Sequence, residues 1–342
     1  MWRAGTAIYP YWYAIRQYPS AALPAPPSAA LPRLTRMPAA TPGPGAGRYA
    51  PSPSGDLHLG NLRTAILAWV LARRTGRAFH LRVEDLDRVQ EGAAQRQLED
   101  LAALGLDWDG EVVRQSERGA DHEAAIGSLT AQGLVYECYC TRREILEAPS
   151  APHAPPGAYP GTCRDLSSPE REAGRERMRE LRREPALRLR AEVTEWSVQD
   201  LWEGEVRGTV DDLVLRRGDG VVAYNLAVVV DDAAAGVDQV ARGDDLLSSA
   251  PRQAHLAHLL GLPEPTYAHV PLALNTAGAR LAKRDGAVTL RDRLAAGESA
   301  ADVVERIGDS LGVPDCRSAA DLLEAWDPAG MSRRPWVVDL PA

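Results

Sequence analysis

The sequence has few cysteines, no long apolar run and no excess of positive charge. Four cysteines in 342 residues do not make a disulfide framework. The longest apolar runs, such as residues 221–230, are too short and interrupted to span a bilayer. A formal net charge of −8 at pH 7 argues against a protein that coats nucleic acid non-specifically, although a local basic patch can still bind RNA. We therefore expect a cytoplasmic protein without membrane association.

Residues 1–47 differ in composition from the rest of the chain. They are rich in Ala and Pro and show neither helical nor strand periodicity. Pro10 and Arg16 interrupt the apolar core that a secretory signal would need. We interpret the segment as a disordered extension, or as a start assigned too far upstream, because Met37 stands just before the globular pattern.

From Arg48 onward, apolar periodicity alternates between that of strands and that of helices, which predicts an α/β fold with a parallel sheet. A proline-containing insertion without periodicity spans residues 138–163. We expect strands at residues 78–83 and 221–230, and helices at residues 62–70, 94–104, 121–132, 175–183, 252–260 and 303–325.

A loop at residues 51–61 leads from a short strand into a helix. Gly60 permits close approach of a ligand to the backbone, and the helix N-terminus attracts a phosphate. His58 can add a hydrogen bond to developing charge. Alone, this pattern is weak, because a loop histidine beside a glycine is more often structural.

Four further residues suit an amino-acid ligand. Arg48 at a strand start and Arg242 in a loop are candidates to pair a side-chain carboxylate by forked hydrogen bonds. Glu84, at the end of a strand, can hold an ammonium group, and Tyr224 offers an apolar face and a hydroxyl. Each residue taken singly is more often a surface ion pair or a packed tyrosine.

A basic loop at residues 280–286 (RLAKRDG) completes a recognisable pair. Together with the His58 loop it resembles the two signature sequences, HIGH and KMSKS, of class I aminoacyl-tRNA synthetases. The resemblance implies that His58 and Lys283 are catalytic and that His58, Gly60, Asn61 and Lys283 bind ATP with Mg²⁺. Asn61 replaces the last histidine of the first signature, as is usual in the glutamate-specific branch. Ala282 replaces a serine, so we expect reduced or compensated ATP contacts but not inactivity.

The ordered set from Arg48 to about Gly286 resembles the catalytic domain of glutamyl-tRNA synthetases, which implies a Rossmann-like parallel sheet. On this resemblance a carboxylate of L-glutamate attacks the ATP α-phosphorus, and the enzyme acts by orientation and charge stabilisation without a protein nucleophile. The residues implied to bind L-glutamate are Arg48, Tyr49, Ala50, Pro51, Ser52, Glu84, Tyr224 and Arg242.

Three cysteines in the insertion, Cys138, Cys140 and Cys163, can form three corners of a tetrahedral zinc site. Spacing alone leaves reduced loop cysteines as an even alternative. The arrangement resembles that of the glutamyl-Q branch of the family, short paralogues that act on tRNA(Asp), and this implies Tyr159 as the fourth ligand. His153, of a commoner ligand type, competes with it. We favour Tyr159 and one structural Zn²⁺, in an insertion of about residues 136–185 near the RNA acceptor end.

Only 59 residues follow Lys283, which is too few for the large helical anticodon-reading domain of a full glutamyl-tRNA synthetase. We therefore expect a catalytic domain at residues 48–286, a short helical region at 287–342, and a monomer that transfers glutamate to the queuosine base of tRNA(Asp). The alternatives are a truncated enzyme that charges tRNA(Glu), and an inactive RNA-binding paralogue, which Ala282 slightly favours. A small-molecule nucleotidylyltransferase would have no reason to carry Arg48, Glu84 and Tyr224.

Overall fold

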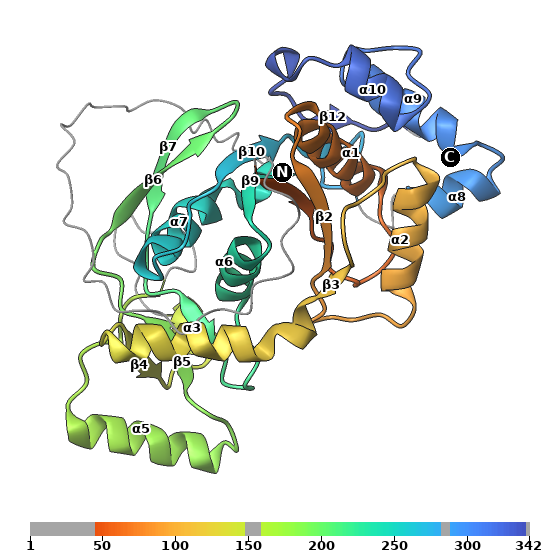
Figure 1. Cartoon of the computed structure of the whole chain (residues 1–342). Coiled ribbons are helices and arrows are strands. Elements are labelled where there is room, and N and C mark those ends of the chain that lie inside the picture. Colours follow the sequence, from red (N-terminus) through yellow and green to blue (C-terminus); the bar gives the residue numbers. More distant parts are fainter. Residues whose placement is uncertain (1–44, 148–158, 282–287, 340–342) are drawn as a thin grey trace, which may run out of the picture. The chain divides into compact units, whose positions relative to one another are not determined.

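The computed structural model describes residues 45–147, 159–281 and 288–339, apart from the side chains of residues 146 and 147 (Figure 1). All the described residues belong to one compact unit. Most of the expected N-terminal extension, with His153, Ala282 and Lys283, lies outside the described residues. The first strand already begins at Ala46.

A seven-stranded sheet in the order β3-β2-β1-β9-β10-β6-β7 forms the centre of the fold. All neighbouring strands are parallel except β6 and β7, which confirms the predicted α/β class. Strands β2 and β3 extend the sheet on one side of β1, and β9 and β10 extend it on the other side. The direction of strand addition therefore reverses at β1. Ligands of such sheets bind beyond the carboxyl ends of the strands at this point. The strands are β1 (Ala46–Tyr49), β2 (Ala78–Val83), β3 (Val113–Arg114), β6 (Glu195–Asp200), β7 (Gly204–Thr209), β9 (Val237–Gly243) and β10 (Thr266–Val270).

Helix α1 (Leu59–Arg74) packs against the middle of this sheet. Its predicted stripe of Leu62, Ala65, Ile66, Trp69 and Val70 is buried, because apolar residues three and four positions apart share one helix face. The predicted helices α2 (Ala93–Ala103), α3 (Gly119–Ala131) and α7 (Ala250–Leu259) are also present. Short 3-10 helices, η1 (Gln115–Arg118) and η2 (Asp244–Ser249), precede α3 and α7.

The strand expected at residues 221–230 is wrong: helix α6 (Tyr224–Ala234) occupies most of this stretch. An unbroken apolar run fits a buried strand and a buried helix equally well, and α6 is buried between α3, α7 and β9. The helix continues through Asp231 and Asp232, which are buried as well. The expected loop position of Arg242 is also wrong, because that residue lies in β9.

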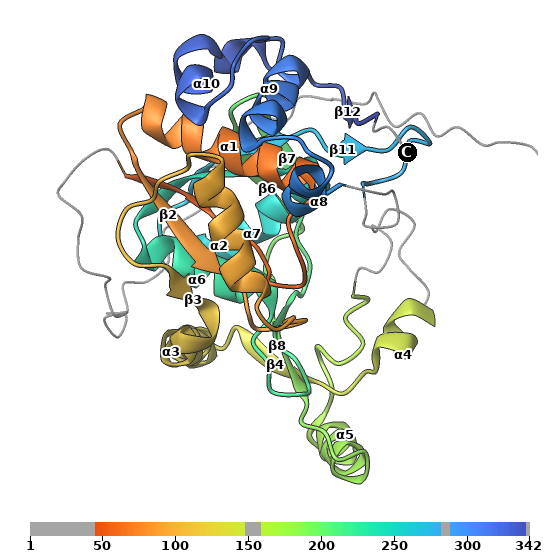
Figure 2. The ribbon, with the colours of Figure 1, turned by 90° about the vertical axis from the view of Figure 1, so that its right-hand side faces the viewer.

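A second, antiparallel sheet in the order β4-β5-β8 joins the start of the insertion to two strands that follow it in the chain. In Figures 1 and 2, α5 lies on the far side of this sheet from the seven-stranded one. Helix α5 is charged around most of its surface, as predicted, although it begins at Ser168 and ends at Glu180 instead of spanning residues 175–183, and it buries only Met178. These elements are β4 (Val135–Cys138), α4 (Arg142–Glu147), α5 (Ser168–Glu180), β5 (Ala186–Leu189) and β8 (Val214–Arg216).

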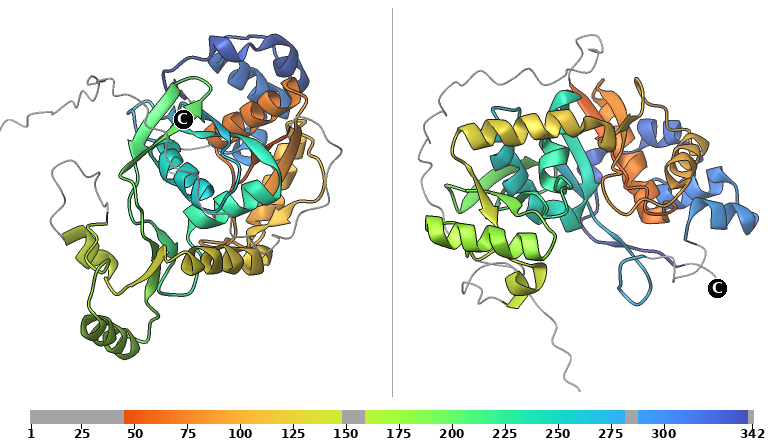
Figure 3. Two further views of the ribbon diagram at one scale, coloured as in Figure 1. Left: turned by 60° about the vertical axis from the view of Figure 1, so that its left-hand side comes forward. Right: turned by 90° about the horizontal axis from the view of Figure 1, so that it is seen from below.

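The last part of the chain packs beside α1, as Figure 3 shows from two sides. Val303, Ile307, Leu322 and Trp326 belong to the same apolar cluster as the buried face of α1. The helix expected at residues 303–325 is two helices, separated by residues 311–318. No helix in the described ranges is long and apolar enough to cross a membrane. The C-terminal elements are α8 (Leu290–Ala295), α9 (Ala300–Ser310), α10 (Ala319–Ala325), η4 (Pro328–Gly330), and the paired strands β11 (Ala273–Leu274) and β12 (Trp336–Val337).

Candidate active site

A cavity of about 840 Å³ opens at the carboxyl ends of β1, β2 and β9. Segments far apart in the sequence meet there, because parallel strands bring their carboxyl ends to one edge of the sheet. Lys283 lies outside the described residues, so its position relative to the cavity stays a prediction. All the other residues predicted to bind ATP or L-glutamate line the cavity: Arg48, Tyr49, Ala50, Pro51, Ser52, His58, Gly60, Asn61, Glu84, Tyr224 and Arg242.

His58 is the N-cap of α1 and forms a reciprocal pair with Asn61. The Asn61 amide donates to His58 Nδ1 (3.2 Å), and the His58 amide donates to Asn61 Oδ1 (3.4 Å). Burial, followed by the charge of Arg280, lowers the pKa of His58 to about 4. The imidazole is therefore neutral near pH 7, and Nε2 carries its proton because Nδ1 accepts. His58 can thus donate from Nε2 while its other nitrogen holds the helix start.

Gly60 is needed for packing as well as for access. A Cβ at this position would lie 2.7 Å from the Cβ of Ala273 in β11 and 3.1 Å from the His58 ring. Any side chain would therefore push the helix start away from β11. The glycine keeps α1 and its unpaired amide groups close to the cavity wall.

The residues on either side of 282–287 in the chain, Leu281 and Val288, lie at the cavity or beside the His58 loop. Leu281 lines the cavity, and the carbonyl of Val288 accepts from the Leu59 amide (2.9 Å). Arg280 also lines the cavity and pairs with Asp245 through Nη1 and Oδ2 at 2.6 Å. The described part of the second predicted ATP-binding segment thus lies at the same cavity as the His58 loop.

A buried charge network stabilises the strand ends under the cavity. Arg48 donates from Nε and Nη2 to the two oxygens of Asp232, each at 3.3 Å. Arg82 donates to Asp232 Oδ1 (2.5 Å) and to Glu84 Oε1 (3.0 Å). Burial would raise the pKa of Asp232, but Arg48 and Arg82 hold it below its usual value. Sequence reasoning missed Arg82 and Asp232, although their charge within apolar stretches was a signal for buried pairs.

Glu84 lines the cavity and is suited to bind a cationic group of a ligand. Burial, the largest effect, raises its pKa, and Arg82 and Arg48 oppose this rise. An ammonium group beside Glu84 would stabilise its charged form in the same way. Tyr224, the first residue of α6, stands at the same cavity with its ring partly exposed.

Arg242 differs from Arg48 because no carboxylate lies within ion-pair distance of it among the described residues. Its guanidinium is held by neutral acceptors, and it lies 5.0 Å from the centre of the Tyr267 ring. The side chain is only 5% exposed, so water does little to compensate its charge. A ligand carboxylate would supply the missing countercharge.

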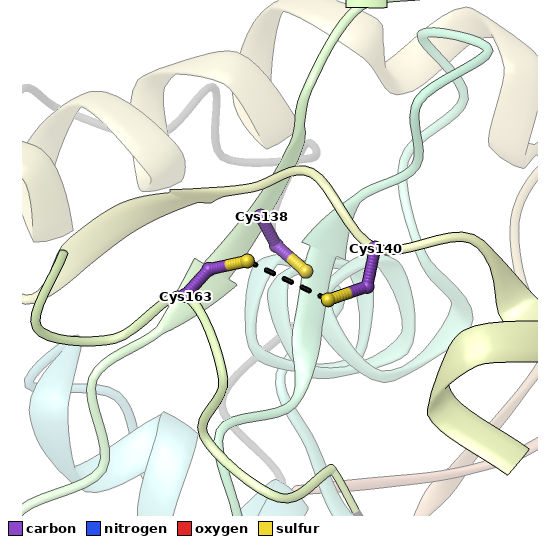
Figure 4. A group of neighbouring side chains, drawn as sticks. All are labelled: Cys138, Cys140 and Cys163. Carbon is purple, nitrogen blue, oxygen red and sulfur yellow. Dashed lines mark hydrogen bonds between the residues drawn. The ribbon is translucent and has the colours of Figure 1, made fainter. Parts of the chain in front are cut away.

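The three insertion cysteines form a cluster that fits a metal ion (Figure 4). Their sulfur atoms lie within 4.8 Å of one another, and the Sγ atoms of Cys140 and Cys163 are 3.5 Å apart. Ligands of a tetrahedral site with Zn–S bonds of about 2.3 Å would be about 3.8 Å apart. All three cysteines are free thiols, and their spacing is compatible with shared coordination of one metal ion.

Tyr159 brings an oxygen to this cluster. Its hydroxyl lies 3.4 Å from Cys138 Sγ and 3.9 Å from Cys140 Sγ, and it accepts from the Cys163 amide at 2.8 Å. The guanidinium of Arg188 lies 3.7 Å from the centre of its ring and makes a cation–π contact that helps hold the ring in place. The donors therefore fit a closed site of three thiolates and one phenolate. His153, the competing ligand, lies outside the described residues.

A second cavity of about 990 Å³ extends from the first toward the cysteine cluster. Both cavities include Ser52, Glu84, Arg88 and Tyr224, which therefore mark their junction. Three arginines on its wall, Arg142, Arg183 and Arg188, have no carboxylate partner among the described residues, whereas Arg217 pairs with Asp87 and Asp219. The surface between the insertion and the first cavity can therefore receive an anionic chain.

Comparisons with known proteins agree with this geometry. The family model described as "tRNA synthetases class I (E and Q), catalytic domain" matches residues 46–303. A protein of Nocardia farcinica named glutamyl-Q tRNA(Asp) synthetase is 65% identical over 294 residues, which are 86% of this chain and 93% of the relative. A protein of the same name from Cutibacterium acnes is 51% identical over 283 residues, 81% of this chain and 79% of the relative.

Solved structures show the same fold. A glutamate tRNA ligase from Elizabethkingia meningosepticum, determined in complex with its amino acid, superposes with a TM-score of 0.71 at 22% identity, over 86% of this chain and 66% of that one. The ligase from Elizabethkingia anophelis gives a TM-score of 0.72 at 22% identity, over 86% and 68% of the two chains. The cavity at the strand ends, the signature loops and these relatives lead to one conclusion: the chain belongs to the class I tRNA synthetase family of E and Q type, and it is a ligase.

Proposed function

We propose that this enzyme activates L-glutamate with ATP, without needing tRNA for that step, and transfers the glutamate to the queuosine base of tRNA(Asp). The carrying observation is that one cavity combines a phosphate-binding helix start at His58 with residues suited to both charges of an amino acid. We infer the acceptor from the name glutamyl-Q tRNA(Asp) synthetase, which the relatives from Nocardia farcinica and Cutibacterium acnes share.

In the first step, a carboxylate oxygen of glutamate attacks the α-phosphorus of ATP, and pyrophosphate leaves. The N–H groups at the start of α1 and the Nε2–H of His58 stabilise charge that develops on the phosphate oxygens. Lys283, the only lysine in the sequence, stabilises the departing pyrophosphate, and Mg²⁺ accompanies ATP. The protein orients the reactants and provides no nucleophile.

In the second step, a hydroxyl of the modified base attacks the glutamyl carbonyl carbon. An ester forms, AMP leaves, and the hydroxyl proton is released. The acceptor base would enter through the second cavity, where the exposed Arg142 and Arg183 can contact RNA phosphates. The junction at Arg88 and Tyr224 connects this route with the glutamate pocket.

The cysteine cluster would hold one structural Zn²⁺ through Cys138, Cys140, Cys163 and Tyr159. The ion would cross-link the insertion, because four protein donors leave no position for a substrate. Residues 48–286 would form the catalytic domain, with the insertion at about 136–185. Residues 287–342 would add a short helical region, and the enzyme would act as a monomer.

Transfer of labelled glutamate to purified tRNAs tests the function. The substrates are tRNA(Asp) with and without queuosine, and tRNA(Glu), each before and after periodate oxidation of the 3′ end. We expect label only on queuosine-containing tRNA(Asp), unaffected by oxidation of the 3′ end. Label on tRNA(Glu) that periodate abolishes would instead identify an enzyme that charges tRNA(Glu).

A glutamate-dependent ATP–pyrophosphate exchange assay tests the first step separately. We expect exchange in the absence of tRNA. If no exchange occurs at any tRNA concentration, the chain is an inactive paralogue, the reading that Ala282 slightly favours.

A further inference from the structure

Two buried arginines at the cavity have different electrostatic partners. Arg48 shares both oxygens of Asp232 in a forked pair, so a carboxylate of the protein already offsets its charge. Arg242 makes three hydrogen bonds, and each acceptor is neutral. The charge of Arg242 is therefore the one left for a ligand, as judged from the described residues.

The first acceptor is His269, whose tautomer is determined by its neighbours. Arg242 donates from Nε to His269 Nε2 (3.1 Å), and His269 Nδ1 lies 2.7 Å from Asp200 Oδ2. A guanidinium has only donors and a carboxylate only acceptors, so the imidazole carries its proton on Nδ1 and is neutral. Burial, the largest effect, lowers the pKa of His269 although Asp200 opposes it, which agrees with a neutral ring.

Asp200 is itself immobilised by the backbone. It accepts from the amides of Trp202 and Glu203 at 2.9 Å and from the amide of His269 at 3.1 Å. These bonds place the aspartate at the end of β6 and hold it against β10. The carboxylate reaches Arg242 only through the imidazole, so it orients the arginine without neutralising it directly.

The second acceptor is Gln253 of α7. Its Oε1 accepts from Arg242 Nη1 (2.7 Å), and its Nε2 donates to Asn225 Oδ1 in α6 (2.9 Å). The carbonyl of Leu246 accepts from Nη2 (3.2 Å). Side chains on β10 and α7 and a backbone carbonyl in η2 thus hold the guanidinium at three points.

From this arrangement we infer that His269 and Gln253 are positioning residues that determine the specificity for a substrate side-chain carboxylate. They hold Arg242 as an oriented but uncompensated cation. A glutamate side chain supplies the countercharge, whereas the neutral amide of glutamine leaves the buried charge unpaired. The inference rests on the proposed glutamate-activating function and names the residues that give it this specificity.

Gln253→Glu tests the inference directly, because it keeps the shape of the side chain and places a carboxylate against Arg242. We expect the KM for glutamate in the exchange assay to rise at least about tenfold, the scale of one lost charge-assisted interaction. The KM for ATP should stay within about twofold. The preference for glutamate over glutamine in kcat/KM should fall by a similar factor to the rise in KM.

Gln253→Met is the matched control, since it removes the acceptor without adding a charge. We expect its KM for glutamate to rise by only about threefold, because Arg242 loses one of its three positioning bonds but keeps its uncompensated charge, and the preference for glutamate over glutamine should be retained. Equal effects of both substitutions, with an unchanged glutamate preference, would mean that Gln253 has a merely structural role and would overturn the inference.

Substitutions at His269 test the inference independently, in case Gln253→Glu does not fold. His269→Leu should raise the KM for glutamate selectively, and His269→Gln, which keeps an acceptor for Arg242, should restore much of the loss. An unchanged glutamate KM in His269→Leu would also overturn the inference. A wild-type enzyme without glutamate-dependent exchange would instead overturn the proposed function, and this inference with it.

Discussion

Leu59 donates its backbone amide to the carbonyl oxygen of Val288 at 2.9 Å, and this bond joins the start of α1 to the residues that follow the basic loop. His58 and Thr289 form an antiparallel bridge beside it. The helix start is therefore tied by the backbone to the residues that follow the second predicted ATP-binding segment. Substitutions in either segment can then be interpreted as changes in chemistry at a common site.

His58→Asn should separate the two roles of this histidine. Asparagine is a preferred N-cap residue, so the urea midpoint should stay close to that of the wild type. The Nε2–H donor is lost, and we expect glutamate-dependent exchange to fall about 100-fold. Undiminished exchange would show that His58 acts only as a cap.

The pKa of His58 also predicts a pH dependence of stability. The folded protein keeps this ring neutral down to about pH 4, whereas the unfolded chain protonates it near 6.5. Between these values the unfolded state binds more protons, so the free energy of unfolding must fall as the pH drops from 6.5 to 4. Urea titrations at pH 7 and pH 4.5 should show a smaller loss for His58→Asn than for the wild type.

His255 provides the comparison for that experiment. Burial, followed by the charge of His258, lowers its pKa to about 4 as well, and His255 lines neither of the two cavities described above. His255→Gln should likewise reduce the loss of stability toward pH 4.5, while exchange activity stays unchanged. Equal pH dependence in the wild type and both variants would contradict the neutral state of these rings.

Lys283 can be tested with unusual selectivity because the sequence contains no other lysine. An amine-acylating reagent should modify one side chain, detected by peptide mass spectrometry, apart from the terminal amine. We expect ATP to protect Lys283 and Lys283→Met to lower exchange about 100-fold. Labelling that ATP does not slow would place Lys283 away from the phosphates.

Zinc content should distinguish Tyr159 from His153 as the fourth ligand. Native mass spectrometry should find one zinc ion per chain, and Cys163→Ser should abolish it. In a chelator competition, Tyr159→Phe should weaken zinc binding at least about tenfold, which is the usual loss of metal affinity when a residue around a metal site is replaced. His153→Ala should bind zinc as tightly as the wild type does. The reverse result for the last two variants would assign the site to His153.

Asp232→Asn should destabilise the fold strongly, because Arg48 and Arg82 would lose the buried carboxylate they share. We expect a loss of about 3–5 kcal/mol in the free energy of unfolding, measured in urea. Glu172→Gln is the control, since Glu172 pairs with Arg179 on the exposed surface of α5, and its substitution should leave the free energy of unfolding nearly unchanged. Similar losses for both variants would contradict a cooperative buried network.

Local sequence patterns predicted those helices and strands whose type is determined by the periodicity of a single short segment. The apolar stripe of α1 and the alternation in β2 are examples, because burial of one face imposes a period within a few residues. Residues 221–230 are the counterexample. Their apolar run has no distinguishing period, and the packing of α6 between α3, α7 and β9 decides for a helix.

The sequence by itself determined the α/β class, the order of the motifs and the residue types suited to phosphate, carboxylate and zinc. Only the tertiary structure decided which charges remain available. Arg48 and Asp232 are paired across 184 residues, and Arg242 reaches Asp200 only through His269. The parallel sheet brings such partners together, not their spacing along the chain. No local pattern could therefore show that a carboxylate of the protein offsets the charge of Arg48 and that none does so for Arg242 among the described residues.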